Sequence, residues 1–110
     1  MTAELRTFGH ATLVVTVDGS PLLATDPWLV GSTYWASWWL ERYPDPDDID
    51  LVRQSQFTYL THSHPDHFHW SSLRMLGPRT TLHPMFPSYS LPAFLIQQGY
   101  PAYTLQPWQR

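Results

Sequence analysis

The stretch that decides the fold is Thr61-His62-Ser63-His64-Pro65-Asp66-His67, which directly follows the apolar run Phe57-Thr58-Tyr59-Leu60. Alternate side chains of an extended chain point the same way, so His62 and His64 can grip one ion. Pro65 keeps the preceding residue extended and ends the strand, which lets Asp66 and His67 turn back toward the same cavity. The stretch therefore predicts a metal site built within one loop after a strand.

The chemistry of these side chains limits the choice of metal. Imidazole and carboxylate groups suit zinc, manganese or iron, and a cluster of this kind can hold one or two divalent ions. We expect zinc first, with manganese and iron as alternatives, and the predicted ligands are His62, His64, Asp66 and His67. The competing interpretation is a solvated polar loop that is rich in histidine. The ligand spacing, the strand before the loop and the helix expected after it favour the metal site.

The same run resembles the H-x-H-x-D-H signature of the metallo-β-lactamase fold superfamily. The segments before it, Gly9-His10-Ala11-Thr12, residues 13–17 and Leu22-Leu23-Ala24-Thr25-Asp26-Pro27-Trp28, resemble the opening hairpin of that superfamily. Asp26-Pro27-Trp28-Leu29, with Trp38-Trp39, most resembles the lactonase-like branch and the hydrolase-like domain of CMP-N-acetylneuraminate monooxygenases. The resemblance extends from about Phe8 to Trp108.

The resemblance implies a role for each residue of the site. His62 and His64 would hold a first metal, and Asp66 and His67 a second. Asp66 would also be catalytic, because this position orients the attacking water in the superfamily. Asp26 could be a plain turn residue before a proline, but the resemblance implies that it hydrogen-bonds the metal loop and orients a ligand from behind.

The wall of the active site is a separate question. His10 is either a satisfied structural histidine or a residue that faces the site, and the sequence leaves both open. Trp28, Trp38 and Trp39 are candidate wall residues. Because Trp35, Trp38 and Trp39 are spaced as on one helical face, core packing is the first expectation, and a wall that binds sugars or other flat substrates is the alternative. His69 and His83 are expected to be structural or surface residues.

The remaining sequence predicts an α/β fold. We expect strands over residues 13–17, 22–25, 57–60, 80–83 and 103–105, a loop over residues 30–50 with one helical turn at 35–40, and helices over residues 51–54, 71–76 and 90–98. Asp18-Gly19 is the first turn, Ser71 the expected cap of the second helix, and Gly77 and Gly99 the expected helix ends. Strands that alternate with helices predict largely parallel pairing after the opening hairpin. In terms of the resemblance, this is the first half of an αββα sandwich.

Composition excludes several classes of function. Residues 1–110 provide room for one small domain, which the resemblance makes a partial one. There is no cysteine, hence no thiolate ligand or cysteine nucleophile, and all six basic residues are arginine, scattered along a chain of net charge −3. Nucleic acid is therefore not an expected partner. The chain has no apolar run of ~20 residues and no signal-peptide pattern at its start, so we expect a cytoplasmic protein without membrane contact.

The second half of the superfamily fold is absent from this sequence. That half would supply a further histidine, a bridging aspartate and a last histidine, yet no His, Asp or Glu occurs between Pro84 and Arg110. We therefore expect a partner, the missing half of the fold or a second copy, to cover the sheet. We also expect this segment alone to be a very weak hydrolase.

Three functions remain open at this point. The first is a metallohydrolase in which metal-bound hydroxide attacks an ester, lactone, amide or phosphoester. The second is an iron-binding oxidoreductase component like the monooxygenase, whose Rieske cluster would need cysteines from elsewhere. The third is an inactive truncated fragment. For the enzymatic functions we expect a small-molecule substrate, with sugar derivatives among the candidates.

Overall fold

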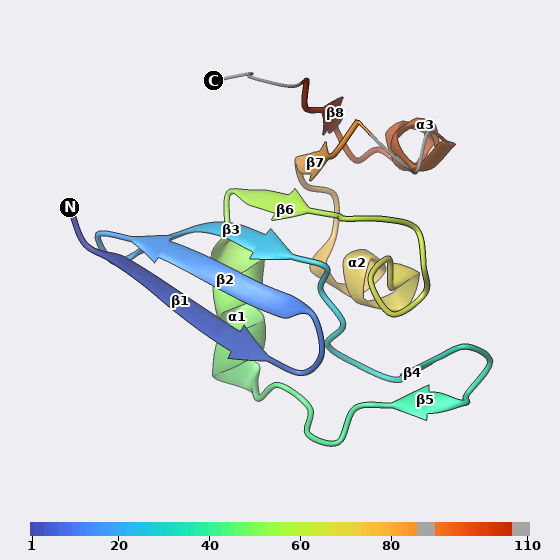
Figure 1. Cartoon of the computed structure of the whole chain (residues 1–110), viewed down its shortest axis with the longest axis horizontal. Helices are drawn as coiled ribbons and strands as arrows, with labels where there is room; N and C mark the ends of the chain where they lie inside the picture. The colour runs from blue at the N-terminus through green and yellow to red at the C-terminus, as the bar shows by residue number, and fades with distance from the viewer. Residues whose placement is uncertain (86–89, 107–110) are drawn as a thin grey trace.

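The computed structural model describes residues 1–85 and 90–106 (Figure 1). In chain order its elements are β1 (Ala3–Phe8), β2 (Thr12–Val17), β3 (Ser20–Thr25), β4 (Ser32–Thr33), β5 (Trp38–Trp39), α1 (Pro46–Gln54), β6 (Phe57–Tyr59), α2 (Trp70–Leu76), β7 (Thr81–His83), α3 (Ser90–Gln97) and β8 (Ala102–Thr104). This order confirms the predicted α/β class. Trp108, the far limit of the resemblance, lies outside the described residues.

The main sheet has six strands in the order β1-β2-β3-β6-β7-β8. The first three strands pair antiparallel, and β3, β6, β7 and β8 pair in parallel. The predicted parallel pairing after the opening hairpin is therefore confirmed. Parallel neighbours need a crossover connection, and α2 and α3 lie within two of these connections.

The buried positions of the strands all lie on one face of this sheet. Val14 is opposite Ala24, Ala24 is opposite Thr58, and Thr58 is opposite Thr81, so these four side chains form one row across the sheet. All four are fully buried. Thr12, two residues before Val14, and His83, two residues after Thr81, lie on the same face and are also buried. The helices pack on this face, since the helix side chains of both core clusters meet these strands.

The opposite face of the sheet is apolar but less covered. Leu13, Val15, Leu23 and Tyr59 occupy the alternate positions and are only partly buried, although three of them lie on the inner strands β2 and β3. Leu5, opposite Val15 on the edge strand, is 70% exposed. Among the described residues no strand position on this face is buried. We call it the open face of the sheet.

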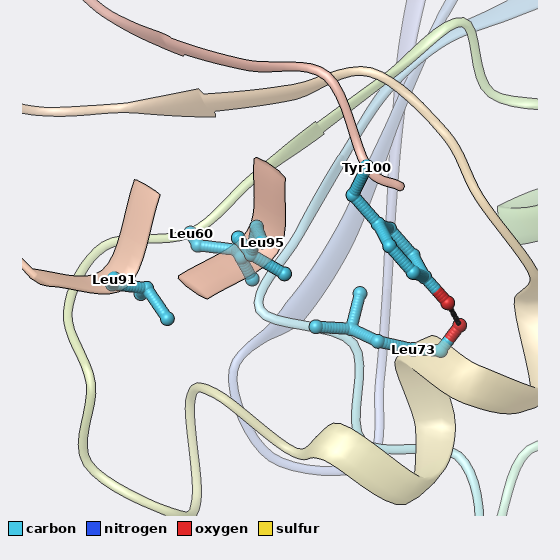
Figure 2. Close-up of a cluster of buried hydrophobic side chains, with 5 residues drawn as sticks. All are labelled: Leu60, Leu73, Leu91, Leu95 and Tyr100. Carbon is cyan, nitrogen blue, oxygen red and sulfur yellow. Dashed lines mark hydrogen bonds between the residues drawn. The ribbon is translucent and has the colours of Figure 1, made fainter. Parts of the chain in front are cut away.

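Two hydrophobic clusters join the helices to the buried face. Figure 2 shows the first, in which Leu60 at the end of β6 meets Leu73 of α2, Leu91 and Leu95 of α3, and Tyr100. The Tyr100 hydroxyl donates a hydrogen bond to the Leu73 carbonyl oxygen at 2.8 Å, which satisfies the polar end of a buried ring. This cluster fixes the backbone at Leu60, the residue directly before the histidine loop.

The second cluster attaches α1 to strands β2 and β3. Val14, Ala24, Leu29 and Val52 are its buried members. Arg79, from the segment before β7, adds a polar connection, because its guanidinium donates to the carbonyl oxygens of Val52, Arg53 and Ser55 at the end of α1. Carbonyl groups at a helix end have no partner within the helix, so this contact both caps α1 and ties it to the sheet.

Helix α1 is longer than the sequence analysis predicted. The loop expected up to residue 50 ends at Asp45, whose side chain accepts from the Asp48 backbone N–H at 2.9 Å, and Asp48 returns the contact in a capping box. Pro46 occupies the first helical position. A backbone N–H at this position has no acceptor within the helix, so the lack of an N–H in proline costs no hydrogen bond. The prolines and acids that suggested a loop are therefore the start signals of a helix.

The aromatic segment after β3 forms a two-stranded ribbon instead of the expected helical turn. Strands β4 and β5 pair antiparallel, and Tyr34, Trp35 and Ala36 between them have positive φ angles of 51°, 53° and 63°. Trp35, Trp38 and Trp39 are 94%, 50% and 64% exposed. The expectation that these tryptophans pack in the core was wrong, because helical spacing has no meaning in a ribbon.

Two smaller predictions also need correction. Strand β1 was not predicted, since every one of its residues before Phe8 is exposed and carries no burial pattern to detect. Helix α2 begins at Trp70, after His69, and not after a Ser71 cap, and its N-cap side chain makes no capping bond. Its end at Gly77, with φ 84°, agrees with the prediction.

The open face leads to a prediction about association. We expect the isolated chain to self-associate or to unfold without a sharp transition, because apolar sheet surface of this extent drives contact between molecules. The double variant Val15→Lys, Leu23→Lys should reduce the associated fraction in sedimentation velocity. A matched variant with two exposed apolar residues away from the sheet, Trp39→Lys, Ile96→Lys, should not. A monomeric wild type with a sharp two-state thermal transition would contradict the prediction.

Candidate metal centre

The site forms at the edge of the sheet where β3 and β6 end. Because these strands are parallel, their carboxyl ends meet, and Asp26 after β3 lies beside the histidine loop after β6. The Asp26 backbone N–H donates to the Tyr59 carbonyl oxygen at 2.9 Å, which extends the pairing by one residue. Asp26 has a φ of 38° and is 2% exposed, so local contacts hold it in an unfavourable backbone conformation.

The Asp26 carboxylate binds the histidine loop through three hydrogen bonds. One oxygen accepts from the Thr61 backbone N–H at 2.8 Å. The other accepts from the Thr61 hydroxyl at 2.7 Å and contacts Nδ1 of His67 at 2.9 Å. A buried carboxylate is stable only when it is paired in this way.

These bonds determine which nitrogens face the site. A carboxylate accepts only, so the Nδ1 atom of His67 must carry the proton that lies against Asp26, and its Nε2 lies on the other side of the ring, 3.4 Å from Asp66 Oδ2. The single Thr61 hydroxyl proton is directed to Asp26, so His62 donates from Nδ1 to the Thr61 oxygen at 2.8 Å, and its Nε2 is the nitrogen that this bond leaves available. Both histidines thus present the nitrogen that a metal requires.

Asp66 is the second carboxylate of the site and is bound by three different segments. Its Oδ1 accepts from the Tyr34 hydroxyl at 2.8 Å, and its Oδ2 lies 2.9 Å from His10 Nε2 and 3.4 Å from His67 Nε2. Burial alone would raise the pKa of Asp66, but the bonds from Tyr34 and His10 outweigh it and the pKa lies below its usual value. The hydrogen bond to Asp66 raises the pKa of Tyr34 in turn.

The imidazole rings gather around this carboxylate. The ring centroid of His62 lies 4.1 Å from that of His67 and 4.7 Å from that of His64, and His10 lies 5.6 Å from His67. The potential ligand atoms of His10, Asp66 and His67 lie within 4.8 Å of one another, so this group could hold a metal ion. Burial, followed by the neighbouring His67 and His64, lowers the pKa of His62, which keeps that ring neutral and able to bind.

This group of ligand atoms differs from the predicted ligand set. It includes His10, for which two interpretations were open, and it does not include His62 and His64, whose rings contact each other while that of His62 also contacts His67. No described contact tests the ligand roles of His62, His64, Asp66 and His67, and these stay predictions. Tyr34 belongs to the aromatic stretch of the sequence, but no local pattern around it could have revealed its bond to Asp66, a residue 32 positions away.

The candidate wall residues have different environments. Trp28 is 2% exposed, and its ring packs edge-on against His10 at 5.9 Å, so it supports the site from within the fold. Trp38 is half exposed and packs on the ring of Tyr34 at 4.7 Å. Trp39 is exposed and its indole N–H bonds to the Ala36 carbonyl oxygen on the same ribbon.

The two histidines outside the loop motif are buried structural residues. His69 Nε2 donates to the Ser32 carbonyl oxygen at 3.1 Å, and its Nδ1 accepts from the Ser72 hydroxyl at 2.7 Å. His83 contacts the Thr81 hydroxyl at 2.8 Å. Burial lowers the pKa of both, so both rings are neutral at pH 7.

A hollow on the described surface lies away from this cluster. It has a volume of about 730 Å³ and lies between β1 and residues 41–48, with arginine and carboxylate side chains around it. Two of these, Arg6 and Asp48, form an ion pair with each other at 2.9 Å. Charges that are already paired leave little to attract a ligand. The converging donors around Asp66 are the better candidate site.

The fold and this cluster together define a class of protein. The chain is a mixed α/β protein with a histidine and aspartate group, at the edge of its sheet, that could hold a metal. No helix in the described part of the chain is long and apolar enough to cross a membrane. No protein-family model and no solved structure matches the chain.

Known proteins resemble the chain over part of their length. It is 31% identical over 96 residues to the cytidine monophosphate-N-acetylneuraminic acid hydroxylase of Asterias rubens, a match that covers 84% of this chain and 14% of that protein. The hydroxylase of Sus scrofa is 31% identical over 61 residues, and the inactive hydroxylase of Homo sapiens is 33% identical over 61 residues, covering 56% of this chain and 14% and 12% of those proteins. The chain is thus a distant homologue of one segment of these hydroxylases.

The role of Asp26 can be tested by removing its charge. Asp26→Asn should lower the affinity for zinc by roughly 10–100-fold, because asparagine has one acceptor oxygen and an NH2 group in place of two acceptor oxygens, cannot accept all three hydrogen bonds and no longer fixes the His67 tautomer. Isothermal titration with zinc measures this. Asp50→Asn, at an exposed carboxylate that pairs only with Arg53, is the matched control and should leave the affinity unchanged. Equal zinc affinity of Asp26→Asn and wild type would contradict the assigned role.

The buried His83 predicts a pH dependence of stability. Its folded-state pKa is lowered from 6.5 by burial, so as the pH falls through 6.5 the unfolded chain binds a proton that the folded chain does not. The free energy of unfolding should therefore fall between pH 7.5 and 5.5, by at most about 1.4 kcal/mol per pH unit for this group. His83→Gln should flatten that fall in urea unfolding with chelator present. An equally steep fall in the variant would show that His83 does not contribute.

Proposed function

We propose that residues 62–67 bind a divalent transition metal together with His10, and that the chain is the metal-binding segment of an enzyme like the hydroxylases it resembles. One observation carries the proposal: the ligand atoms of His10, Asp66 and His67 lie within 4.8 Å of one another, and the Asp26 carboxylate holds the His67 ring through its Nδ1. A polar surface loop would have no reason to be organised in this way.

The residues fit such an ion in number and in chemistry. Three or four imidazoles with one carboxylate suit zinc or iron, and when bound such an ion would act as a Lewis acid and lower the pKa of a coordinated water. Asp66 would bind through Oδ2 while Tyr34 holds Oδ1. His10 donates from Nε2 to Oδ2, so it would bind the ion through Nε2 only after that proton had moved to solvent and the ring held its proton on Nδ1. Asp26 would keep His67 in place throughout.

The reaction class follows from two separate lines of support. The match over 84% of the chain to a protein named a hydroxylase favours a component of an oxidative enzyme that acts on a sugar nucleotide. Because residues 1–110 contain no cysteine, an iron–sulfur cluster for such chemistry would be held by residues outside this sequence. The H-x-H-x-D-H run favours the second candidate, a metallohydrolase of the metallo-β-lactamase superfamily, for which zinc would be the metal.

The open face bears on partners. We propose that the chain is one half of an αββα sandwich and that a second layer covers Leu13, Val15 and Leu23. The proteins that it resembles are about seven times longer than the matched segment, so room for that layer exists in proteins of this kind. The activity of the whole enzyme would then require that second layer as well as the metal.

The metal proposal is tested by removing two imidazoles. The double variant His62→Ala, His64→Ala should lose most of the zinc and iron that the wild type retains after dialysis, because two of its four loop ligands are gone. Mass spectrometry of the protein measures the metal content. Ser63→Ala, an exposed change within the same loop, is the control and should retain the metal.

The outcome separates the candidate functions. Equal metal content in wild type and double variant would overturn the proposed site. Selective retention of iron in wild type would favour the oxidative component, and selective retention of zinc would favour the hydrolase. Circular dichroism of the variant confirms that the loss concerns ligands and not folding.

A further inference from the structure

A groove lies beside the candidate metal centre, on the other side of Tyr34. It has a volume of about 390 Å³ and runs between the β4–β5 ribbon and residues 65–71. Tyr34 lines it and also donates its hydroxyl proton to Asp66, and Pro65, next to Asp66 in sequence, lines it as well. Tyr34 therefore belongs both to the groove and to the candidate metal centre.

The side chains around the groove determine what it can bind. Four of its ten lining residues carry large aromatic rings, namely Tyr34, Trp35, Phe68 and Trp70. None of its ten lining residues is Asp, Glu, Lys or Arg, and its one histidine, His69, is buried with both ring nitrogens in hydrogen bonds. A phosphate or carboxylate would find no counter-charge here. Apolar ring surface is what these side chains can cover.

The groove also has unused hydrogen-bonding capacity. Thr33 is one of its lining residues and is 4% exposed, and its buried hydroxyl has no hydrogen-bond partner among the described residues. Buried hydroxyls normally have a partner, so this one points to a missing acceptor or donor. The hydroxyl groups of Ser32 and Ser71 lie at the same groove and add polar atoms to its aromatic surface.

We propose that this groove binds an uncharged ring with one apolar face and a hydrogen-bonding edge, the chemistry that neutral sugars and nucleobases share. The inference rests on the proposed function, because it assigns the non-reacting part of the substrate to the groove and the reacting part to the metal side of Tyr34. Binding energy from a non-reacting ring is a common means of positioning the reacting end. Trp35, at 94% exposure, would stack on the ring from the rim.

The experiment is a titration of the chain with three small probes in the presence of a chelator. Methyl β-D-glucopyranoside represents the sugar, adenosine the base, and adenosine monophosphate adds a charge to the same base. The readout is the ¹H–¹⁵N spectrum of the tryptophan indole groups. We expect saturable shifts of the Trp35 and Trp70 indole signals with at least one neutral probe, and no tighter binding when the phosphate is present.

Two exposed tryptophans of one ribbon provide the matched variants. Trp35→Ala should weaken binding roughly 3–10-fold, the usual size of one aromatic stacking contact. Trp39→Ala, on the same ribbon but outside this groove, should leave binding unchanged. The neutral probe that binds identifies the ring as sugar or base.

Several results would overturn the inference. They are the absence of saturable shifts with both neutral probes, equal weakening by Trp35→Ala and Trp39→Ala, or binding of the monophosphate more than tenfold tighter than adenosine. Because chelator is present, none of these results depends on the metal site. Failure of the groove and failure of the proposed metal site are therefore seen in separate measurements.

Discussion

The carboxylate of Asp26 is the constraint on which the rest of the site depends. It is buried at the end of β3, and a buried charge must be matched by donors. Among the described residues, its hydrogen-bond donors all come from the histidine loop: the Thr61 backbone N–H, the Thr61 hydroxyl and His67. The loop therefore cannot leave the end of β3 without exposing an unpaired carboxylate, a cost of about 3–5 kcal/mol for a buried pair broken on one side.

The same carboxylate also determines how the histidine rings of the loop are oriented. A run of histidines in a loop has many possible ring orientations, and only those with Nε2 free toward a common point can hold an ion. Asp26 fixes His67 directly, and through the Thr61 hydroxyl it fixes His62 as well. Tyr34 and His10 complete the arrangement from two other turns by holding Asp66. The site is thus assembled from four segments, but its orientation is determined by one side chain.

The sequence predicted those features that depend on neighbours close in the chain. The alternation of side-chain type predicted β2, the apolar run before His62 predicted β6, and Gly77 predicted the end of α2. Each of these signals depends only on residues close together in the chain. The contact between Asp26 and the loop was also expected, although only because of the resemblance. Local sequence patterns did not predict the features that depend on residues far away in the chain. Strand β1 is an exposed edge held by its pairing with β2, and Tyr34 has meaning only through Asp66.

The two sides of the sheet explain why so much of a site can form in so short a chain. The donors around Asp66 come from strand ends and turns along one edge, and their hydrogen bonds lie within the described residues. The sheet itself is different, because none of the described strand positions on its open face is buried. The hydrogen bonds that organise the cluster around Asp66 are therefore formed among the described residues, while one face of the sheet stays uncovered by them.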